Sequence, residues 1–583
     1  MAEELFKNLM YGDMLNSPGY EVEYAVGLTY SLDLDALISV PMSFGLLGES
    51  EEIVNKSPAY LLAAIRKSSD KMAVFCNAGN IKVPKESRVV YSLLENCIFQ
   101  VKQKGSFHPK LWVVQEKNEN GKRRIRLVVL SRNLTFDDSI DIVVSLTGDV
   151  SGSEHNRKPY MPVVNLLDWV AKFASKEKRD MVRKVCDSIR HVNKFIADAP
   201  FEEECEFYTF NDKLMSQADV MDVIQGTDAI IFSPFIEEKT LEWLFKKARR
   251  KILVTRRNFI TQPVLDMVGK GNVYSVNEGL LDDEETSIDL HAKIYFISKD
   301  GYNDLYLGSA NATYSAFNRN SELLLRLRFQ KNASGYEKFR KAMLEDDDNQ
   351  FVPVCTSFAD DNSIGGKPME DKVLREVIRN IIGAKVKISG KMYDTVVSFK
   401  KCDWNMPVKI MTLQGVANRA NVTITKETVI PGTALKDLSD FYVITVGSQV
   451  ATQVRTIVKI DTEGIPPERD DVLFQSIVDT ESKFINYISF LLTENPQEYI
   501  YNEEQQRKLL QRKGASRETP VVSSLYEDML VAMTHHSDRL DVIEEDIDKF
   551  GDKVPESFRQ MLEVFKESRK SLREFKGTRK NVR

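Results

Sequence analysis

The stretch that decides the fold reads Ser106-Phe107-His108-Pro109-Lys110-Leu111-Trp112-Val113-Val114, and Leu130-Ser131-Arg132-Asn133-Leu134-Thr135 follows it. The pattern returns as Leu290-His291-Ala292-Lys293-Ile294-Tyr295-Phe296, followed by Leu307-Gly308-Ser309-Ala310-Asn311-Ala312-Thr313. In each copy, His-x-Lys opens a run of apolar, β-branched and aromatic residues, and a second such run ends in Ser-x-Asn. Such runs are typical of buried strands, so we expect each motif at the end of a strand.

The His and Lys of each copy are expected to project together, because residues two apart in a strand point to the same face. Each Asn is expected on the turn that ends a neighbouring strand. Together these groups can attack a phosphodiester and hold its oxygens. The doubled set comprises His108, Lys110, Asn133, His291, Lys293 and Asn311.

Length and charge indicate a globular protein of several domains. At roughly 100–200 residues per domain, a chain of 583 residues predicts about three or four units. The net charge of -6 gives no global sign of nucleic-acid binding, so such binding must use local basic surface. No apolar run reaches the ~18–20 residues of a membrane span, and residues 1–7 lack the pattern of a secretion signal.

Cysteine and histidine usage argues against a metal centre. The six cysteines include no Cys-x-x-Cys pair, which disfavours a zinc site or a disulfide framework and favours a cytoplasmic protein. Of the six histidines, only His108 and His291 have Lys two residues later, and His535-His536 has no second pair of ligands at metal spacing. We therefore expect no metal and no cofactor.

Strand-like and helix-like segments alternate around the motifs in the same order twice, which predicts an α/β fold with a mostly parallel or mixed sheet and an internal duplication. The expected strands cover residues 24–30, 72–76, 96–101, 125–130 and 141–146, then 229–232, 251–255, 272–276, 304–308 and 322–327. The expected helices cover residues 36–40, 57–68, 163–173, 178–195, 238–248 and 261–267.

The character of the sequence changes past about residue 345. Acidic segments at 345–349 and 360–366 look like a linker, and alternating β-type runs over 385–460 predict a small antiparallel sandwich or barrel. Residues 470–492 read as one helix. From about residue 519 the chain reads as charged helix with an apolar stripe, which favours packing on its own chain and leaves partner docking or self-association open.

The paired His-x-Lys and Ser-x-Asn elements resemble the phospholipase D superfamily over about residues 20–335. The usual signature continues to an Asp, whose positions here hold Gln115 and Ser298. Loss of this Asp resembles the tyrosyl-DNA phosphodiesterase branch and some nuclease relatives, which also carry a polar residue at the head of the last strand. Asp141 and Glu322 occupy such places.

The resemblance implies a duplicated α/β/α sandwich, and no matching motif covers residues 370–583. We accordingly expect a first half with a helical connector over 1–200, a second half over 201–350, a β-rich module over 367–465 and a helical region over 466–583.

The resemblance also implies phosphoryl transfer in two steps without a metal. One His attacks phosphorus to form a phosphohistidine, and the other protonates the leaving oxygen and then activates water or an alcohol for the second step. By resemblance His108 is the nucleophile and His291 the acid, although the residues themselves do not assign this order. The lysines and asparagines would hold the non-bridging oxygens. Asp141 and Glu322 either orient the histidines or start strands at the surface.

Several further residues have both a functional and a structural interpretation. Ser131 and Ser309 either donate to phosphate or are small turn residues. Arg256 and Arg257 follow the carboxyl end of a strand, where α/β sheets bind ligands. The basic segments 122–124 and 246–251 either track a nucleic-acid backbone or form solvated faces. Trp112 and Tyr295 could stack on bases, but aromatics inside strands are more often core.

These patterns favour a metal-independent phosphodiesterase acting on nucleic acid, with DNA favoured over RNA. The alternatives are an end-processing enzyme like tyrosyl-DNA phosphodiesterase, a phospholipid phosphodiesterase or transferase, and a scaffold with an inactive site. No membrane-binding surface is visible in the sequence. Restriction nucleases of this superfamily join such a unit to a β-rich DNA reader, so a prokaryotic defence role is suggested by analogy.

Overall fold

The computed structural model describes residues 19–43, 58–135, 139–197, 205–210, 223–277, 289–299, 301–330, 335–345, 350–358, 368–416, 421–448, 453–493, 525–535 and 537–580. The linker expected over 345–349 and 360–366 lies almost entirely outside these residues. Among the described residues, no helix combines the length and apolar character that crossing a membrane requires.

The first sheet has six strands in the order β3-β2-β1-β4-β5-β7. Strands β1, β2 and β3 are parallel to one another, and β4, β5 and β7 continue the sheet in antiparallel fashion. The strands are β1 (Glu21–Thr29), β2 (Met72–Asn77), β3 (Ile98–Val101), β4 (Leu111–Lys117), β5 (Arg123–Leu130) and β7 (Val143–Asp149).

The second sheet has eight strands in the order β16-β11-β10-β9-β13-β14-β15-β8. Its six strands from β11 to β15 repeat the spatial order, chain order and directions of the first sheet. The strands are β8 (Cys205–Phe210), β9 (Asp228–Phe232), β10 (Arg250–Val254), β11 (Val273–Val276), β13 (Ile294–Ser298), β14 (Tyr302–Gly308), β15 (Glu322–Gln330) and β16 (Phe351–Pro353).

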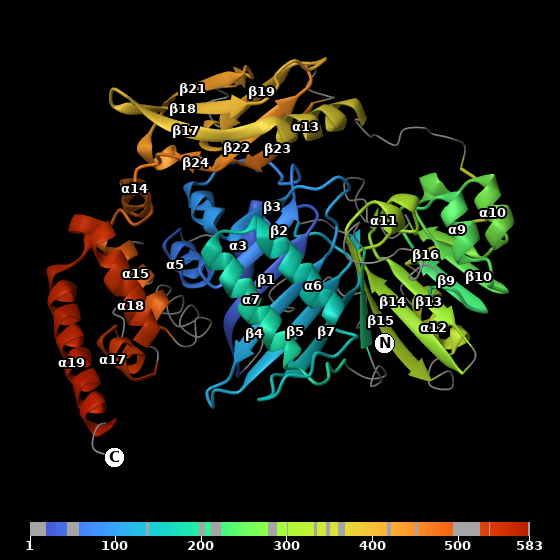
Figure 1. The fold of residues 1–583 in the computed structure, drawn as a ribbon, viewed down its shortest axis with the longest axis horizontal. Coiled ribbons are helices and arrows are strands. Elements are labelled where there is room, and N and C mark those ends of the chain that lie inside the picture. The colour runs from blue at the N-terminus through green and yellow to red at the C-terminus, as the bar shows by residue number, and fades with distance from the viewer. Residues whose placement is uncertain are drawn as a thin grey trace, which may run out of the picture.

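One continuous apolar core contains residues from one face of each sheet and from the helices α6, α7 and α12. Helices α3 and α5 pack on the other face of the first sheet, and α9, α10 and α11 on that of the second, so both sheets are covered on both faces (Figure 1). Their bounds are α3 (Leu34–Ser43), α5 (Pro58–Ser69), α6 (Met161–Val170), α7 (Lys176–Arg190), α9 (Glu238–Leu244), α10 (Gln262–Val268), α11 (Tyr314–Asn318) and α12 (Tyr336–Leu344).

Short elements complete this part of the chain. Strand β6 (Ser139–Ile140) pairs in parallel with β12 (Asp289–Leu290) and so joins the two motif regions. The 3-10 segments here are η1 (Val89–Cys97), η2 (Ala171–Phe173) and η3 (Arg257–Phe259). Helix α7 ends at Arg190, so the expectation of a helix to residue 195 is wrong.

The β-rich region consists of α13 (Pro368–Asn380) and two four-stranded sheets with mainly antiparallel pairing. The sheet orders are β21-β18-β17-β24 and β20-β19-β22-β23. The strands are β17 (Ile381–Ser389), β18 (Met392–Phe399), β19 (Val408–Thr412), β20 (Val422–Thr423), β21 (Glu427–Thr433), β22 (Phe441–Val446), β23 (Val454–Lys459) and β24 (Thr462–Glu463), with η5 (Gln414–Val416) and η6 (Leu435–Asp437) between them.

This region is fixed to the first sheet by buried polar contacts. The N–H of Ile457 donates to Ile81 O at 2.9 Å. Glu95 is buried and accepts from Ser439 Oγ at 2.5 Å and from Arg469 Nη1 at 2.9 Å. Burial raises the pKa of Glu95 to about 7, against the opposing charge of Arg469. Removing Arg469 would therefore take away the positive charge that favours the ionised carboxylate in the junction.

The C-terminal region is helical and shares one apolar core with α3, α5 and the face of the first sheet that these two helices cover. It contains α14 (Glu468–Ile477), α15 (Glu481–Leu492), α17 (Leu525–His535), α18 (Ser537–Asp546), η7 (Ile547–Lys553) and α19 (Glu556–Lys580). Figure 1 shows these helices (red) on the side of the first sheet away from the second. Buried Asp546 anchors them by accepting from Arg66 Nε at 3.1 Å and Tyr487 Oη at 2.7 Å.

The expectation of one helix over residues 470–492 is wrong. The helix is interrupted between α14 and α15, and Thr480 caps the second helix by accepting a hydrogen bond from Lys483 N. A capping threonine satisfies an N–H that has no partner within the helix, so the break costs little. The segment 519–524 of the expected C-terminal helix lies outside the described residues.

Candidate active site

The two motif copies meet at one edge of the sheets. Strand β4 runs antiparallel to β1, so His108 and Lys110, which precede β4, lie at the carboxyl end of β1. Strand β13 has the same relation to β9, which puts His291 and Lys293 at the corresponding edge of the second sheet. Carboxyl ends of parallel strands are where open α/β sheets bind ligands.

Two short parallel bridges cross between the sheets at this edge. Phe107 pairs with Ser321, and Leu290 pairs with Ile140. The N–H of His108 donates to Ser321 O at 2.9 Å, and the N–H of His291 donates to Ile140 O at 3.0 Å. In both bridges the residue before a histidine is paired with the residue before an acidic residue. The bridges thus bring His108 beside Glu322 of the other half, and they put His291 and Asp141 at the next position of the backbone register.

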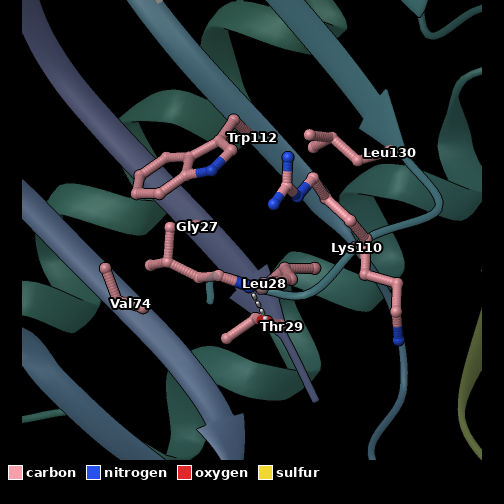
Figure 2. Close-up of a pocket in the computed structure, with 9 residues that line it drawn as sticks. Gly27, Leu28, Thr29, Val74, Lys110, Trp112 and Leu130 are labelled. Atoms are coloured by element: carbon pink, nitrogen blue, oxygen red, sulfur yellow. Dashed lines mark hydrogen bonds between the residues drawn. The ribbon is translucent and has the colours of Figure 1, made fainter. Parts of the chain in front are cut away.

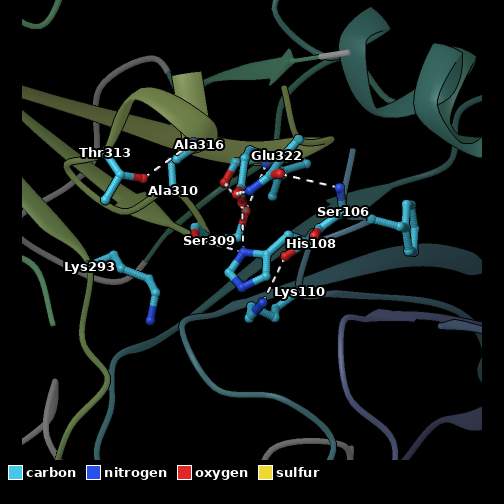
Figure 3. A network of polar contacts seen from close by, with 12 residues as sticks. Ser106, His108, Lys110, Lys293, Ser309, Ala310, Thr313, Ala316 and Glu322 are labelled. Atoms are coloured by element: carbon cyan, nitrogen blue, oxygen red, sulfur yellow. Dashed lines mark hydrogen bonds and ion pairs between the residues drawn. The ribbon is translucent and has the colours of Figure 1, made fainter. Parts of the chain in front are cut away.

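His108 is held by Glu322 of the second sheet. Its Nδ1 lies 2.9 Å from Glu322 Oε2 and 3.1 Å from Ser309 O. A carboxylate oxygen and a backbone carbonyl oxygen both accept, so the network assigns the proton to Nδ1 and leaves the Nε2 lone pair for the site. Figure 3 shows this contact, with Lys293 of the second half to one side of the histidine. Burial lowers the pKa of His108, which favours the neutral imidazole.

The Glu322 carboxylate is fully buried and has further donors. Ser309 Oγ donates to Oε2 at 2.5 Å, and Asn320 Nδ2 donates to Oε1 at 3.1 Å. Ser106 N in turn donates to Asn320 Oδ1 at 3.2 Å. This network fixes the carboxylate before any substrate binds.

Asp141 has the matching environment in the first sheet. Its two oxygens accept from Ser131 Oγ at 2.8 Å and from Ser139 Oγ at 2.9 Å. Burial raises the pKa of Asp141, while Lys293 and Arg132 oppose that shift. Asp141 lies between β6 and β7, not at the head of the strand as expected, whereas Glu322 begins β15. Neither carboxylate is at the surface.

Ser131 and Ser309 are supports for the carboxylates. Each is buried, donates to the acidic residue of its own half and accepts from the backbone N–H of the residue after that acid, Ile142 N and Leu323 N, both at 2.9 Å. Because the single proton of each hydroxyl is already used, the structure does not direct it toward a phosphate.

The two lysines are buried beside the histidines of their own copies. Lys110 Nζ donates to His108 O at 2.8 Å, and Lys293 Nζ donates to His291 O. Burial holds the pKa of Lys110 well below its ordinary value and lowers that of Lys293 to about 8. Glu322 and Asp141 act electrostatically on both lysines, so these charges share one centre.

Asn133 and Asn311 lie half-buried on the turns after β5 and β14, as expected. Tyr295 is fully buried and donates from Oη to Ala310 O at 2.9 Å, which ties β13 to the second turn. Trp112 is also buried, and its ring covers Gly27, where an added Cβ would lie 2.7 Å from the indole. Both aromatics are core residues, so the alternative of base stacking on them is wrong.

A small pocket adjoins Lys110 on the first sheet, and Figure 2 shows its walls. It is lined mainly by apolar residues, which include Leu28 of β1, Trp112 of β4 and Leu130 of β5, and Arg132 adds a second basic side chain. Close by, the Tyr30 ring centroid lies 5.0 Å from that of His108. The sequence had marked Tyr30 only as the end of a strand.

The arginines and basic segments separate into two groups. Arg256 lies at the motif edge, bonds Asp289 at 2.5 Å and reaches Leu290 O at 3.4 Å, next to His291. Arg257 lies farther out, 3.4 Å from Ser275 Oγ. The segments 122–124 and 246–251 lead into β5 and β10, at the sheet edge opposite the motifs. Those segments therefore do not line the site.

Two exposed aromatics at the motif edge escaped the sequence analysis. Phe235 follows β9, is 37% exposed and has Arg256 over its ring at 4.4 Å. Tyr314 begins α11, is 52% exposed and has Arg319 over its ring at 5.4 Å. No local pattern distinguishes them from core aromatics.

Asn320 and Ser139 were also missed, but a signal existed. Each stands two residues before a carboxylate, in Asn320-Ser321-Glu322 and Ser139-Ile140-Asp141. A polar residue at this spacing in both copies marks a donor to the carboxylate. Within the described residues, no group of three or more His, Cys, Asp or Glu side chains could hold a metal ion.

No protein-family model and no curated protein matches the chain. Solved structures with partial similarity include yeast tyrosyl-DNA phosphodiesterase, at 13% identity and a TM-score of 0.33 over 56% of this chain and 88% of that one. Polyphosphate kinase from Porphyromonas gingivalis has 8% identity and a TM-score of 0.31 over 54% and 42% of the two chains. NucT from Helicobacter pylori has 17% identity and a TM-score of 0.20 over 26% and 100%. Similarity this low carries no argument about activity, which rests on the site itself.

Proposed function

We propose that the chain is a phosphodiesterase that cleaves nucleic acid through a phosphohistidine intermediate, with no metal required. The two sheets would be the halves of a duplicated phospholipase D-like unit over residues 1–200 and 201–350. One observation carries the proposal. Two His-x-Lys motifs meet at a single edge, and His108 is bonded through Nδ1 to a buried carboxylate from the other half.

The proposed first step uses His108 as nucleophile. Its Nε2 lone pair attacks phosphorus, the bond from phosphorus to the leaving oxygen breaks, and protonated His291 gives that oxygen its proton. The Glu322 carboxylate stabilises the positive charge that develops on the His108 ring. Support for this order comes from the lowered pKa of His108 and from its Nδ1 contact with Glu322.

The proposed second step releases the product. Neutral His291 takes a proton from water, the water oxygen attacks phosphorus, and the bond between phosphorus and His108 breaks. Lys110, Lys293, Asn133 and Asn311 would bind the non-bridging oxygens in both steps. The two buried ammonium groups supply positive charge at the phosphate, which a divalent metal supplies in many other phosphoryl-transfer sites.

Nucleic acid is the substrate that the surroundings of the site favour. Phe235 and Tyr314 are exposed aromatics with arginines over their rings. Bases stack on such rings, and arginines attract a phosphate backbone. The β-rich module (367–465) would then read or hold nucleic acid, and the helical region (466–583) would serve packing or partner docking. DNA over RNA, cytoplasmic action and a role in prokaryotic defence belong to the same proposal.

The test is direct. Purified protein is incubated in EDTA with labelled single-stranded DNA, double-stranded DNA, RNA and a phospholipid. We expect cleavage of a nucleic acid that is lost in His108→Ala and in Lys293→Ala. Turnover of the phospholipid alone would favour the lipid alternative. Cleavage that requires Mg²⁺, or no turnover of any phosphodiester, would overturn the proposal.

A further inference from the structure

One buried hydroxyl holds the turn that carries Asn133. Thr29, at the end of β1, donates from Oγ1 to Ser31 O at 2.8 Å and accepts from Leu134 N at 3.0 Å. Thr29 is 3% exposed and lies beside Lys110 in the wall of the pocket in Figure 2. Because a hydroxyl has one proton, donation to Ser31 leaves its oxygen free to accept from the residue that follows the asparagine.

The second half repeats this arrangement around Asn311. Ser233 Oγ donates to Phe235 O at 2.7 Å and accepts from Ala312 N at 2.9 Å. Ser233 is fully buried, and Ala312 directly follows Asn311. The hydroxyl again links the end of the first parallel strand to the turn of the Ser-x-Asn motif.

The backbone pairing around the two hydroxyls has the same register in both halves. Leu32 pairs with Leu134, and Ile236 pairs with Ala312. The next N–H groups, of Asp33 and Glu237, donate to the same two turns at 2.8 and 2.9 Å.

The local sequences are Thr-Tyr-Ser-Leu-Asp over 29–33 and Ser-Pro-Phe-Ile-Glu over 233–237, which differ in kind at the second and third places. A side-chain hydroxyl at the first place is common to both, and it makes the same two hydrogen bonds. This shared feature points to the asparagine turns as the reason for the hydroxyls.

We infer that Thr29 and Ser233 are positioning residues, which fix Asn133 and Asn311 against the substrate phosphate. The inference rests on the proposed function, because only a bound phosphate gives the asparagine amides a reaction to serve. Without the hydroxyl, the N–H after each asparagine is left buried without this acceptor, and the turn must shift to find another. A shift of that kind misaligns the amide and lowers kcat more than it raises KM.

The experiment compares isosteric and conservative variants at both places. We expect Thr29→Val and Ser233→Ala to lower kcat by about 10–100-fold, the range seen when a group that orients a functional side chain is removed. Thr29→Ser and Ser233→Thr keep the hydroxyl and should restore kcat. Thermal unfolding shows whether each variant is folded, and Ser233→Ala, which removes a single oxygen, carries the test if Thr29→Val does not fold.

Double-variant cycles identify the residue through which each hydroxyl acts. Adding Thr29→Val to Asn133→Ala should lower kcat no further. Adding it to Asn311→Ala should lower kcat by the same factor as Thr29→Val alone. Ser233→Ala should show the reverse. The inference would be overturned if each hydroxyl variant lowered kcat equally in Asn133→Ala and in Asn311→Ala. It would also be overturned if the folded single variants kept the wild-type kcat. If Asn133→Ala and Asn311→Ala themselves cleave at the wild-type rate, the proposed function fails instead.

Discussion

Replacing Glu322 by Gln tests how the second half activates the first. The substitution keeps the shape of the side chain and removes its charge. His108 Nδ1 lies 2.9 Å from Glu322 Oε2, so the two charge centres are about 4 Å apart when the ring becomes positive. At an effective dielectric constant of about 20, that separation corresponds to about 4 kcal/mol. A tenfold change in rate corresponds to about 1.4 kcal/mol of activation free energy, so full loss of this interaction would lower kcat by about 10³-fold.

The glutamine retains part of this interaction through a neutral hydrogen bond, so we expect kcat to fall by about 10²–10³-fold with little change in KM. The assay is single-turnover cleavage of labelled nucleic acid with enzyme in excess. Asp304→Asn is the matched control. Asp304 is equally buried on β14, at the far end of the sheet, where it pairs with Lys299 and Arg328. Glu322→Gln cleaving as fast as Asp304→Asn would refute the role of the carboxylate.

Three further outcomes follow from the charges and exposed rings. Burial lowers the pKa of Lys293 to about 8, so kcat/KM should fall as the pH rises through about 8 and the ammonium loses its proton. Arginine stays charged at this pH, so the same fall of kcat/KM in Lys293→Arg would contradict this prediction. Phe235→Ala and Tyr314→Ala should each weaken binding of single-stranded nucleic acid by about 10–100-fold in fluorescence anisotropy, whereas Tyr526→Ala on α17, exposed at 57%, should not. Arg469→Met leaves Glu95 buried without its counter-charge and should lower the free energy of unfolding by about 3–5 kcal/mol in a denaturant titration; an unchanged midpoint would show that the junction does not depend on this pair.

The places of the motif residues in the strands and turns could be predicted from sequence more fully than the way the two halves assemble. Strand periodicity located the motif residues because apolar runs and His-x-Lys spacing are local signals. The pairing of His108 with Glu322 spans 214 positions in the chain, and no local signal encodes which half supplies which carboxylate. The bridge between Phe107 and Ser321 sets which half supplies the carboxylate, and it joins two segments that are far apart in the chain.

Other failures have equally local causes. The break between α14 and α15 was missed because apolar periodicity continues across it, and the cap at Thr480 decided the boundary. The basic segments 122–124 and 246–251 were given an open role because composition shows charge but not the sheet edge on which it lies. The roles of Ser131 and Ser309 stayed open between phosphate donors and small turn residues, because a hydroxyl serves a carboxylate as readily as a phosphate and the sequence does not show its partner.

The covalent intermediate tests the central claim most directly. In the proposed mechanism His291 is the base that completes hydrolysis, so mixing His291→Ala with labelled single-stranded DNA in EDTA should leave label on the protein. The account predicts an acid-labile adduct at His108 by intact mass and peptide mapping, absent from the double variant His108→Ala/His291→Ala. No adduct in any variant, or an adduct that persists without His108, would contradict it.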